Sequence, residues 1–220
     1  MKTPVLYSFL CIWLVLTISA CNSDDQANPQ LRLEAVGFSG TLPDGRTFGE
    51  KGVLSDNNLV SSASSAEGSY ISHVLSVLDS TAGVSIEVEL PYIKFSDNYN
   101  TPNDSIVDRA AKDYYPYPVV KEKLSVGDKF ILSSQAPEPV NNFRVMVVDQ
   151  KDYVAFTSEG TDQDNSYLKV IELIEGTATD PDRGSVKTME VVFDLDVKLY
   201  EQSSGQSGKL TGLLRMKYWE

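Results

Sequence analysis

The chain has 220 residues, of which 41% are apolar, so it is long enough and apolar enough to fold around a core of its own. Acidic residues outnumber basic ones by 31 to 19, and the formal net charge is −12. This charge repels phosphate backbones, so we expect no nucleic-acid partner. Cys11 and Cys21 are the two cysteines, both near the N-terminus, which excludes a disulfide, a thiolate nucleophile and a cysteine metal cluster in the domain that follows.

Residues 1–20 have the pattern of an export signal peptide. Lys2 gives a positive start, and the apolar run 5–18 has the length of a signal h-region, short of the ~20 residues that a spanning helix needs. Ile18-Ser19-Ala20-Cys21 resembles the bacterial lipobox. The resemblance implies cleavage before Cys21 and acyl chains on its thiol, which would anchor the protein to a membrane. The alternative is an uncleaved N-terminal anchor helix.

Two acidic residues, Asp24 and Asp25, lie three and four positions after Cys21. They resemble the surface-export signal of Bacteroidetes lipoproteins, which implies an outer-membrane protein that faces outward. The alternative is a plain polar tether facing the periplasm. Residues 21–30, with Pro29 and no apolar run, are interpreted as a flexible tether.

Alternation of apolar and polar residues predicts strands along the first half of the remaining chain. A turn at Pro43-Asp44-Gly45-Arg46 separates two short strands. Residues 55–69 are serine-rich and predict a loop or a weak edge strand. Strands are expected at 70–78 and 84–95. In the second of these, one face holds Val84, Ile86, Val88 and Leu90, and the other holds Ser85, Glu87 and Glu89.

The middle of the chain is less regular. A short helix is predicted over 103–115, where Ile106, Ala110 and Tyr114 are spaced four apart, and Pro116 and Pro118 are expected to prevent its continuation. Further strands are predicted at 129–133, 143–149 and 153–157, with a hairpin turn at 150–152 between the last two. Residues 167–174 are ambiguous but favour a strand.

The clearest pair of strands closes the chain. One predicted inner face contains Met189, Val191, Phe193, Leu195, Val197 and Leu199, and the other contains Leu210, Leu214, Met216 and Tyr218. Arg215 and Lys217 would point outward, toward Asp194 and Asp196. This hairpin resembles the C-terminal part of β-rich Bacteroidetes lipoproteins, a resemblance that implies no particular activity. About ten strands with at most one short helix predict an all-β domain over 31–220, an antiparallel sandwich or barrel.

Candidate catalytic groups are few. His73 is the one histidine of the chain, and its alternating neighbours indicate a surface or edge position. No nucleophile elbow, phosphate-binding loop, dinucleotide glycine pattern or zinc motif is present. Glu87 and Glu89 share a strand face and could serve a glycoside hydrolase, but solvated surface carboxylates explain them as well. We expect no catalytic residue and no cofactor.

Two loops carry oxygen ligands at close spacing and are incomplete calcium candidates, through Asp162 and Asp164 in one and Asp180 and Asp182 in the other. Neither completes an EF-hand, and such residues also build ordinary turns. We therefore expect no metal.

Aromatic residues supply the candidate ligand-binding set: Tyr114, Tyr115 and Tyr117 in a proline-rich stretch, with Trp219. Exposed rings could stack on sugars or fill a partner's pocket. The alternative is that the tyrosines plug one end of the fold with their hydroxyls at the rim.

These observations favour a surface-anchored lipoprotein whose non-catalytic domain binds an extracellular glycan or a protein partner. The alternatives are an accessory subunit of an outer-membrane complex, a carboxylate-dependent glycoside hydrolase and a barrel that holds an apolar ligand. An exposed aromatic face would favour the glycan, a broad apolar patch near the tether would favour the accessory subunit, and opposed acids in a cleft would favour the hydrolase.

Overall fold

The computed structural model describes residue 33 and residues 35–48, 58–67, 70–94, 117–133, 142–160, 162–182 and 184–220. Residues 33–220 belong to one compact unit. The predicted signal peptide, Cys21, the tether, the helix expected at 103–115, Tyr114 and Tyr115 lie outside the described residues. In the described part of the chain, no helix has the length and apolar character needed to cross a membrane.

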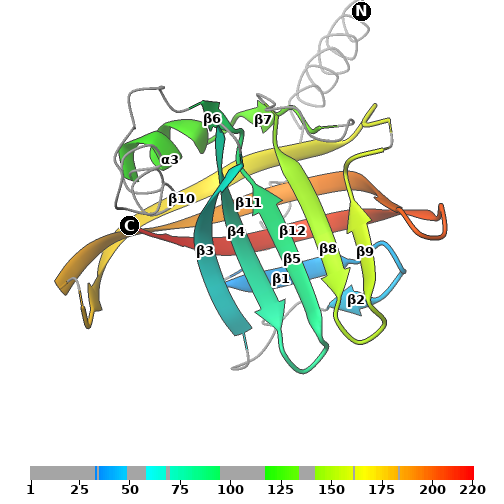
Figure 1. Ribbon diagram of the computed structural model, residues 1–220, viewed down its shortest axis with the longest axis horizontal. Helices are drawn as coiled ribbons and strands as arrows, with labels where there is room; N and C mark the ends of the chain where they lie inside the picture. The colour runs from blue at the N-terminus through cyan, green and yellow to red at the C-terminus, as the bar shows by residue number, and fades with distance from the viewer. Residues whose placement is uncertain are drawn as a thin grey trace, which may run out of the picture. The chain divides into compact units, whose positions relative to one another are not determined.

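Strands dominate the described residues, so the all-β prediction is confirmed (Figure 1). Within the described ranges, twelve strands form one sheet, against about ten predicted for the domain. The elements in chain order are β1 (Gly37–Thr41), β2 (Thr47–Phe48), β3 (Asn58–Glu67), β4 (Tyr70–Asp79), β5 (Val84–Glu89), β6 (Ile93–Lys94), α3 (Tyr117–Lys123), β7 (Lys129–Phe130), β8 (Arg144–Asp149), β9 (Val154–Thr157), β10 (Tyr167–Asp180), β11 (Gly184–Glu201) and β12 (Ser207–Trp219).

The sheet curls over on itself. Its order is β2-β1-β12-β11-β9-β8-β5-β4-β3, β10 joins β11 to β7, and β6 pairs with β4, with all of these strand pairs antiparallel. β11 passes from one layer to the other, because only its last two residues, Tyr200 and Glu201, pair with β9. Figure 1 shows β3, β4, β5, β8 and β9 crossing in front of β10, β11, β12 and β1. The predicted choice between sandwich and barrel is therefore resolved as one sheet folded into a half-barrel.

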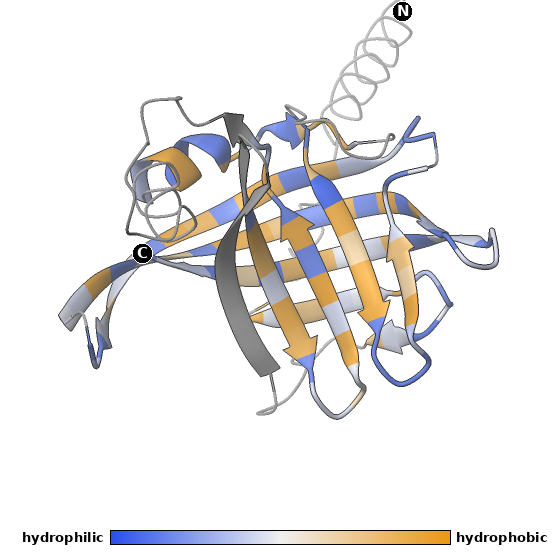
Figure 2. Cartoon of the chain, in the orientation of Figure 1, coloured by the Kyte–Doolittle hydropathy of each residue, from blue (hydrophilic) through white to orange (hydrophobic). Residues whose placement is uncertain are grey.

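The core fills the space between the two layers. Every residue predicted for the inner faces of β5, β11 and β12 is buried, because the side chains of a strand alternate between its two faces. Figure 2 shows hydrophobic residues along the strands and hydrophilic residues in several of the connecting turns. Phe38 of β1 and Phe193 of β11 are among the largest fully buried side chains.

The register of the β11–β12 hairpin corrects one predicted contact. Arg215 lies opposite Val192 and Lys217 lies opposite Glu190, so neither faces Asp194 or Asp196. Glu190 accepts a 2.9 Å hydrogen bond from Arg215 Nε and lies 3.6 Å from Lys217 Nζ. The alternation was predicted correctly, but register depends on the geometry of the turn at 202–206, which alternation leaves open.

The described residues contain one helix, α3, in a segment where no helix was predicted; the predicted helix at 103–115 lies outside the described residues. α3 begins at Tyr117, directly after Pro116, and includes Pro118 in its first turn. Proline is tolerated in that turn because its missing N–H has no partner there in any case. Tyr117, Val120 and Leu124 are spaced three and four apart and are all buried, which docks the helix on the core.

Two other uncertain segments are strands. Residues 58–67 form β3 at the end of the sheet order, in agreement with a weak edge strand in the serine-rich segment. Residues 167–180 form β10, with a register shift between Val170 and Glu172. That shift leaves Ile171 as the extra residue of a β-bulge.

Candidate functional site: the tip of the half-barrel

Three hairpin turns meet at one end of the half-barrel, and we call this end the tip. They are the turns at residues 43–46, 80–83 and 150–153, which join β1 to β2, β4 to β5 and β8 to β9. The Gln150 N–H donates to the carbonyl oxygen of Gly83 at 2.7 Å, and Lys151 Nζ donates to the carbonyl oxygen of Thr81 at 2.7 Å. The β8–β9 turn is therefore fixed to its neighbour by backbone and side-chain hydrogen bonds.

Asp149, the last residue of β8, organises the tip. Its Oδ1 accepts hydrogen bonds from the N–H groups of Lys151 and Asp152, at 2.8 and 3.1 Å, and so shapes the turn. Its Oδ2 accepts a 2.5 Å hydrogen bond from Arg46 Nη2, in the β1–β2 turn. Burial alone would raise the pKa of Asp149, but the two N–H groups and Arg46 outweigh it and lower the pKa.

Tyr153 projects from this rigid turn into solvent. Its side chain is 93% exposed, and its backbone has a φ of 56°, in the left-handed region that costs a residue with a Cβ atom roughly 1 kcal/mol or more. Neither the exposure of an apolar ring nor the backbone strain stabilises the fold. A bulky side chain held in this way is often found at a site of function.

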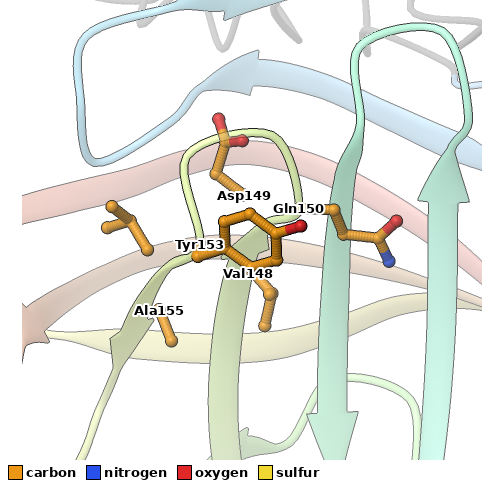
Figure 3. Close-up of a pocket in the computed structure, with 6 residues that line it drawn as sticks. Val148, Asp149, Gln150, Tyr153 and Ala155 are labelled. Carbon is orange, nitrogen blue, oxygen red and sulfur yellow. The ribbon is translucent and has the colours of Figure 1, made fainter.

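A shallow pocket of about 460 Å³ opens beside Tyr153, lined by Val148, Asp149, Gln150, Tyr153, Val154 and Ala155. Figure 3 shows the Tyr153 ring close to Val148, with its hydroxyl on the side of Gln150. Val148 and Ala155 are registered opposite each other on the outer face of β8 and β9, so they form an apolar wall. The exposed Gln150 adds an amide that can both donate and accept hydrogen bonds.

The tip combines an aromatic ring, a small apolar wall and an amide. An aromatic ring can cover the apolar C–H face of a sugar, while an amide binds the hydroxyls at its rim. Asp149 is engaged by the turn and by Arg46 and does not supply a free acid. The arrangement suits binding.

Tyr117, a predicted ligand-binding residue, lies inside the molecule and is 6% exposed. Its ring centroid is 6.1 Å from that of Tyr218, and its hydroxyl donates to Glu175 Oε2 at 2.6 Å. Burial, followed by this bond to Glu175, raises the pKa of Tyr117 to about 12. This arrangement matches the alternative in which a tyrosine fills the end of the fold with its hydroxyl at the rim.

Trp219 is 38% exposed near the end of β12, with Lys217 Nζ 4.5 Å from the centre of its ring. Tyr218 is buried and Trp219 points to the opposite face of the strand. Tyr117 packs with Tyr218 and therefore shares no surface with Trp219. The two described members of the predicted aromatic set are not brought together.

His73 is buried, which corrects its predicted surface or edge position. It is 4% exposed and faces the core from β4, with its ring centroid 5.2 Å from that of Tyr218. Desolvation lowers its pKa to about 4. His73, Tyr117 and Tyr218 form a buried group that we call the aromatic cluster.

The predicted acid pair lies on the outer face of β5. Glu89 forms an ion pair with Arg144, whose Nη1 also lies 3.4 Å from Glu159 Oε2. One guanidinium thus serves two buried carboxylates. Burial raises the pKa of Glu87, an effect that Arg144 opposes and Glu89 reinforces.

The calcium candidates form turns. Asp162 Oδ1 accepts the N–H of Asp164 and Asp180 Oδ1 accepts the N–H of Asp182, both at 2.9 Å, as in ordinary aspartate turns. Within the described ranges, no group of three or more His, Cys, Asp and Glu side chains is arranged to hold a metal ion.

Sequence reasoning predicted the β8–β9 turn but missed Tyr153, which it assigned to the following strand. The signal was weak, because the left-handed backbone that turns the ring outward has no sequence marker at a tyrosine. The contact of Arg46 with Asp149, across 103 residues, was also missed.

Compared with protein-family models, curated proteins and solved structures, the chain matches none.

Proposed function

We propose that this protein is a lipid-anchored, non-catalytic binding protein of the bacterial outer membrane, and that its tip binds an extracellular glycan. The observation that carries the proposal is Tyr153, whose ring is 93% exposed beside a pocket of about 460 Å³ and whose backbone has a φ of 56°. That volume can hold part of a saccharide chain, and the open shape suits a chain that continues beyond it.

The anchor rests on the sequence. The lipobox-like Ile18-Ser19-Ala20-Cys21 supports acylation of Cys21, and the acids behind it support a position on the cell surface. Mass spectrometry of the protein purified from membranes tests the anchor. We expect an N-terminus at Cys21 that carries acyl chains, and an unmodified Met1 would contradict it.

Affinity electrophoresis of the mature protein through gels that contain different bacterial and plant polysaccharides tests the tip. We expect at least one polysaccharide to retard the protein, and Tyr153→Ala to weaken binding about tenfold, the loss of roughly 1.4 kcal/mol of stacking. Tyr153→Phe should retain most of the affinity. Trp219→Ala, which removes an aromatic ring from another surface, is the matched control and should bind as the wild type does.

Two results would overturn glycan binding at the tip. One is equal retardation of Tyr153→Ala and the wild type. The other is co-purification of an envelope protein that depends on Tyr153 while no polysaccharide retards the chain, which would favour a protein partner at the same tip.

The second candidate is a carboxylate-dependent glycoside hydrolase, favoured by the raised pKa of Glu87 beside Glu89. Arg144 weakens this candidate because it holds Glu89 as an ion pair. The matched substitution is Glu87→Gln. If hydrolysis of a polysaccharide is detected and this variant abolishes it, the protein is an enzyme.

A further inference from the structure

β7 lies at the other end of β8 from the tip (Figure 1), and a second exposed apolar surface lies around it. Three aliphatic side chains there reach solvent: Val126 is 59% exposed, Ile131 is 71% exposed and Ile171 is 38% exposed. We call this surface, with Lys129 and Lys169, the β7 face.

Backbone pairing brings these residues together. The Gly127 N–H donates to the carbonyl oxygen of Val170 at 2.8 Å, which places Val126 close to Ile171. Lys129 is registered opposite Lys169 in the β7–β10 pair. Alternation then puts Ile131 on the same side as Lys129, since the two are separated by one residue. Aliphatic side chains and lysines thus share one surface in an acidic protein.

These three aliphatic side chains are not part of the hydrophobic core. Phe130 and Leu168 are registered opposite each other and supply the inner face at this point. Phe130 stacks on Phe143 with ring centroids 4.1 Å apart, and Leu168 is fully buried. Ile171 is the extra residue of the bulge and is 38% exposed, so its side chain is not part of the core. Exposed apolar groups that are close together commonly mark a surface that contacts another protein or a membrane.

The start of the described chain lies on the same side of the sheet. The carbonyl oxygen of Leu33 accepts a 2.8 Å hydrogen bond from Arg215 Nη1. Arg215, Val192 and Glu172 are registered side by side across β12, β11 and β10, so the backbone of Arg215 is about two strand spacings, or roughly 10 Å, from the strand that carries Ile171. The twelve residues from Cys21 to Leu33 span at most about 40 Å.

We propose that the β7 face rests on the surface of the lipid bilayer that holds the anchor. Val126, Ile131 and Ile171 enter the interfacial layer, and Lys129 and Lys169 extend their amino groups to the phosphates of the headgroups. The exposed Glu122 and Asp128 lie nearby, so the aliphatic side chains carry the contact and it needs no strongly anionic lipid. The inference rests on the proposed lipid anchor but not on what the tip binds.

Spin labels on single cysteines test this contact, because acylation occupies Cys21 and cleavage removes Cys11. The lipidated protein is purified from membranes as V126C, I131C or I171C, labelled with a nitroxide and placed in vesicles of phosphatidylethanolamine and phosphatidylglycerol. D152C, in the exposed tip, is the matched control. We expect the three labels to lose accessibility to a water-soluble relaxation agent several-fold relative to the control, and to gain accessibility to oxygen.

A further variant isolates the aliphatic contribution. In lipidated I171C that also carries Val126→Asp and Ile131→Asp, the label should regain its accessibility to water while the protein stays on the vesicles. Equal water accessibility at 126, 131 and 152 in acylated protein would overturn the membrane contact and leave the anchor standing. Spin–spin broadening between copies at 126 would instead assign the surface to a second copy of the chain. Absence of acyl chains in the mass spectrum would remove both the anchor and the contact.

Discussion

Tyr117 in α3 is 6% exposed, whereas Tyr153 in the tip is 93% exposed. Tyr117 belongs to a stretch with three tyrosines and was therefore predicted to bind a ligand, while Tyr153 has no aromatic neighbour within two positions in the sequence and was not predicted. The first is held by packing, at helical spacing from Val120 and Leu124, and the second by a left-handed turn that packing does not require. In this chain, the density of aromatic residues in the sequence indicates where the core closes, whereas the exposed ring of Tyr153 is evident only from the structure.

The largest expected difference is in the free energy of unfolding after each of the two tyrosine rings is removed. Tyr117→Ala should lower the free energy of unfolding by about 3–5 kcal/mol, because it leaves a cavity beside Tyr218. Tyr153→Ala should change it by less than about 0.5 kcal/mol, as for other exposed positions. Urea unfolding of both variants checks the contrast. Tyr117→Phe, which keeps the packing and loses the bond to Glu175, should cost about 1 kcal/mol. Equal losses for the two alanine variants would break the comparison.

Acidification should weaken the aromatic cluster first. The pKa of His73 is about 4 in the fold and 6.5 in the unfolded chain, so unfolding takes up a proton between these values. The stabilisation is fully present above pH 6.5 and is lost as the pH falls toward 4, by up to about 3 kcal/mol. Thermal unfolding from pH 7.5 to 4.5 measures it. His73→Leu should remove this part of the pH dependence, and a parallel slope in that variant would contradict the assignment.

The tip should respond to acid only at lower pH. The folded pKa of Asp149 lies below its ordinary value of 3.8, so its contribution is present above 3.8 and is lost as the pH falls through the folded value. Asp149→Ala should cost about 2 kcal/mol at pH 7, since it removes the turn hydrogen bonds and leaves Arg46 without this partner. The difference from the wild type should shrink below pH 3.8. A constant difference down to pH 2 would show that Asp149 is not held ionised by these contacts.

The smallest effect concerns the backbone of Tyr153. Tyr153→Gly should raise the free energy of unfolding slightly, by up to about 0.5 kcal/mol, because glycine adopts a φ of 56° without strain but also frees the unfolded chain. The same variant should lose glycan binding. Greater stability together with lost binding would sharpen the contrast between a ring kept for function and a ring kept for the fold. A stability loss above about 1 kcal/mol would contradict it.

The sequence predicts the strands well because alternation records which face is buried. The six residues predicted inward between Met189 and Leu199 are buried, and so are the four predicted inward between Leu210 and Tyr218. Alternation does not record register, and Arg215 and Lys217 consequently face Glu190 instead of the predicted aspartates. It also cannot show a long-range contact such as that of Arg46 with Asp149.

The candidate site was less predictable than the fold. His73 lies between Ser72 and Val74 on β4, and the contact of its ring with Tyr218 depends on how β4 packs against β12. Tyr153 required the backbone angle of one residue in a turn. The predicted Tyr117 and Trp219 are separated because consecutive residues of β12, Tyr218 and Trp219, point to opposite faces.

β8 acts as a spacer between the two exposed surfaces. It begins next to Phe143, which stacks on Phe130 of β7, and ends at Asp149 in the tip. Its six residues extend about 20 Å. With the β7 face on the bilayer, the pocket beside Tyr153 would stand roughly that height above the headgroups. At this height the protein would meet long polymers that arrive from outside the cell more readily than short sugars attached to the lipids beneath it.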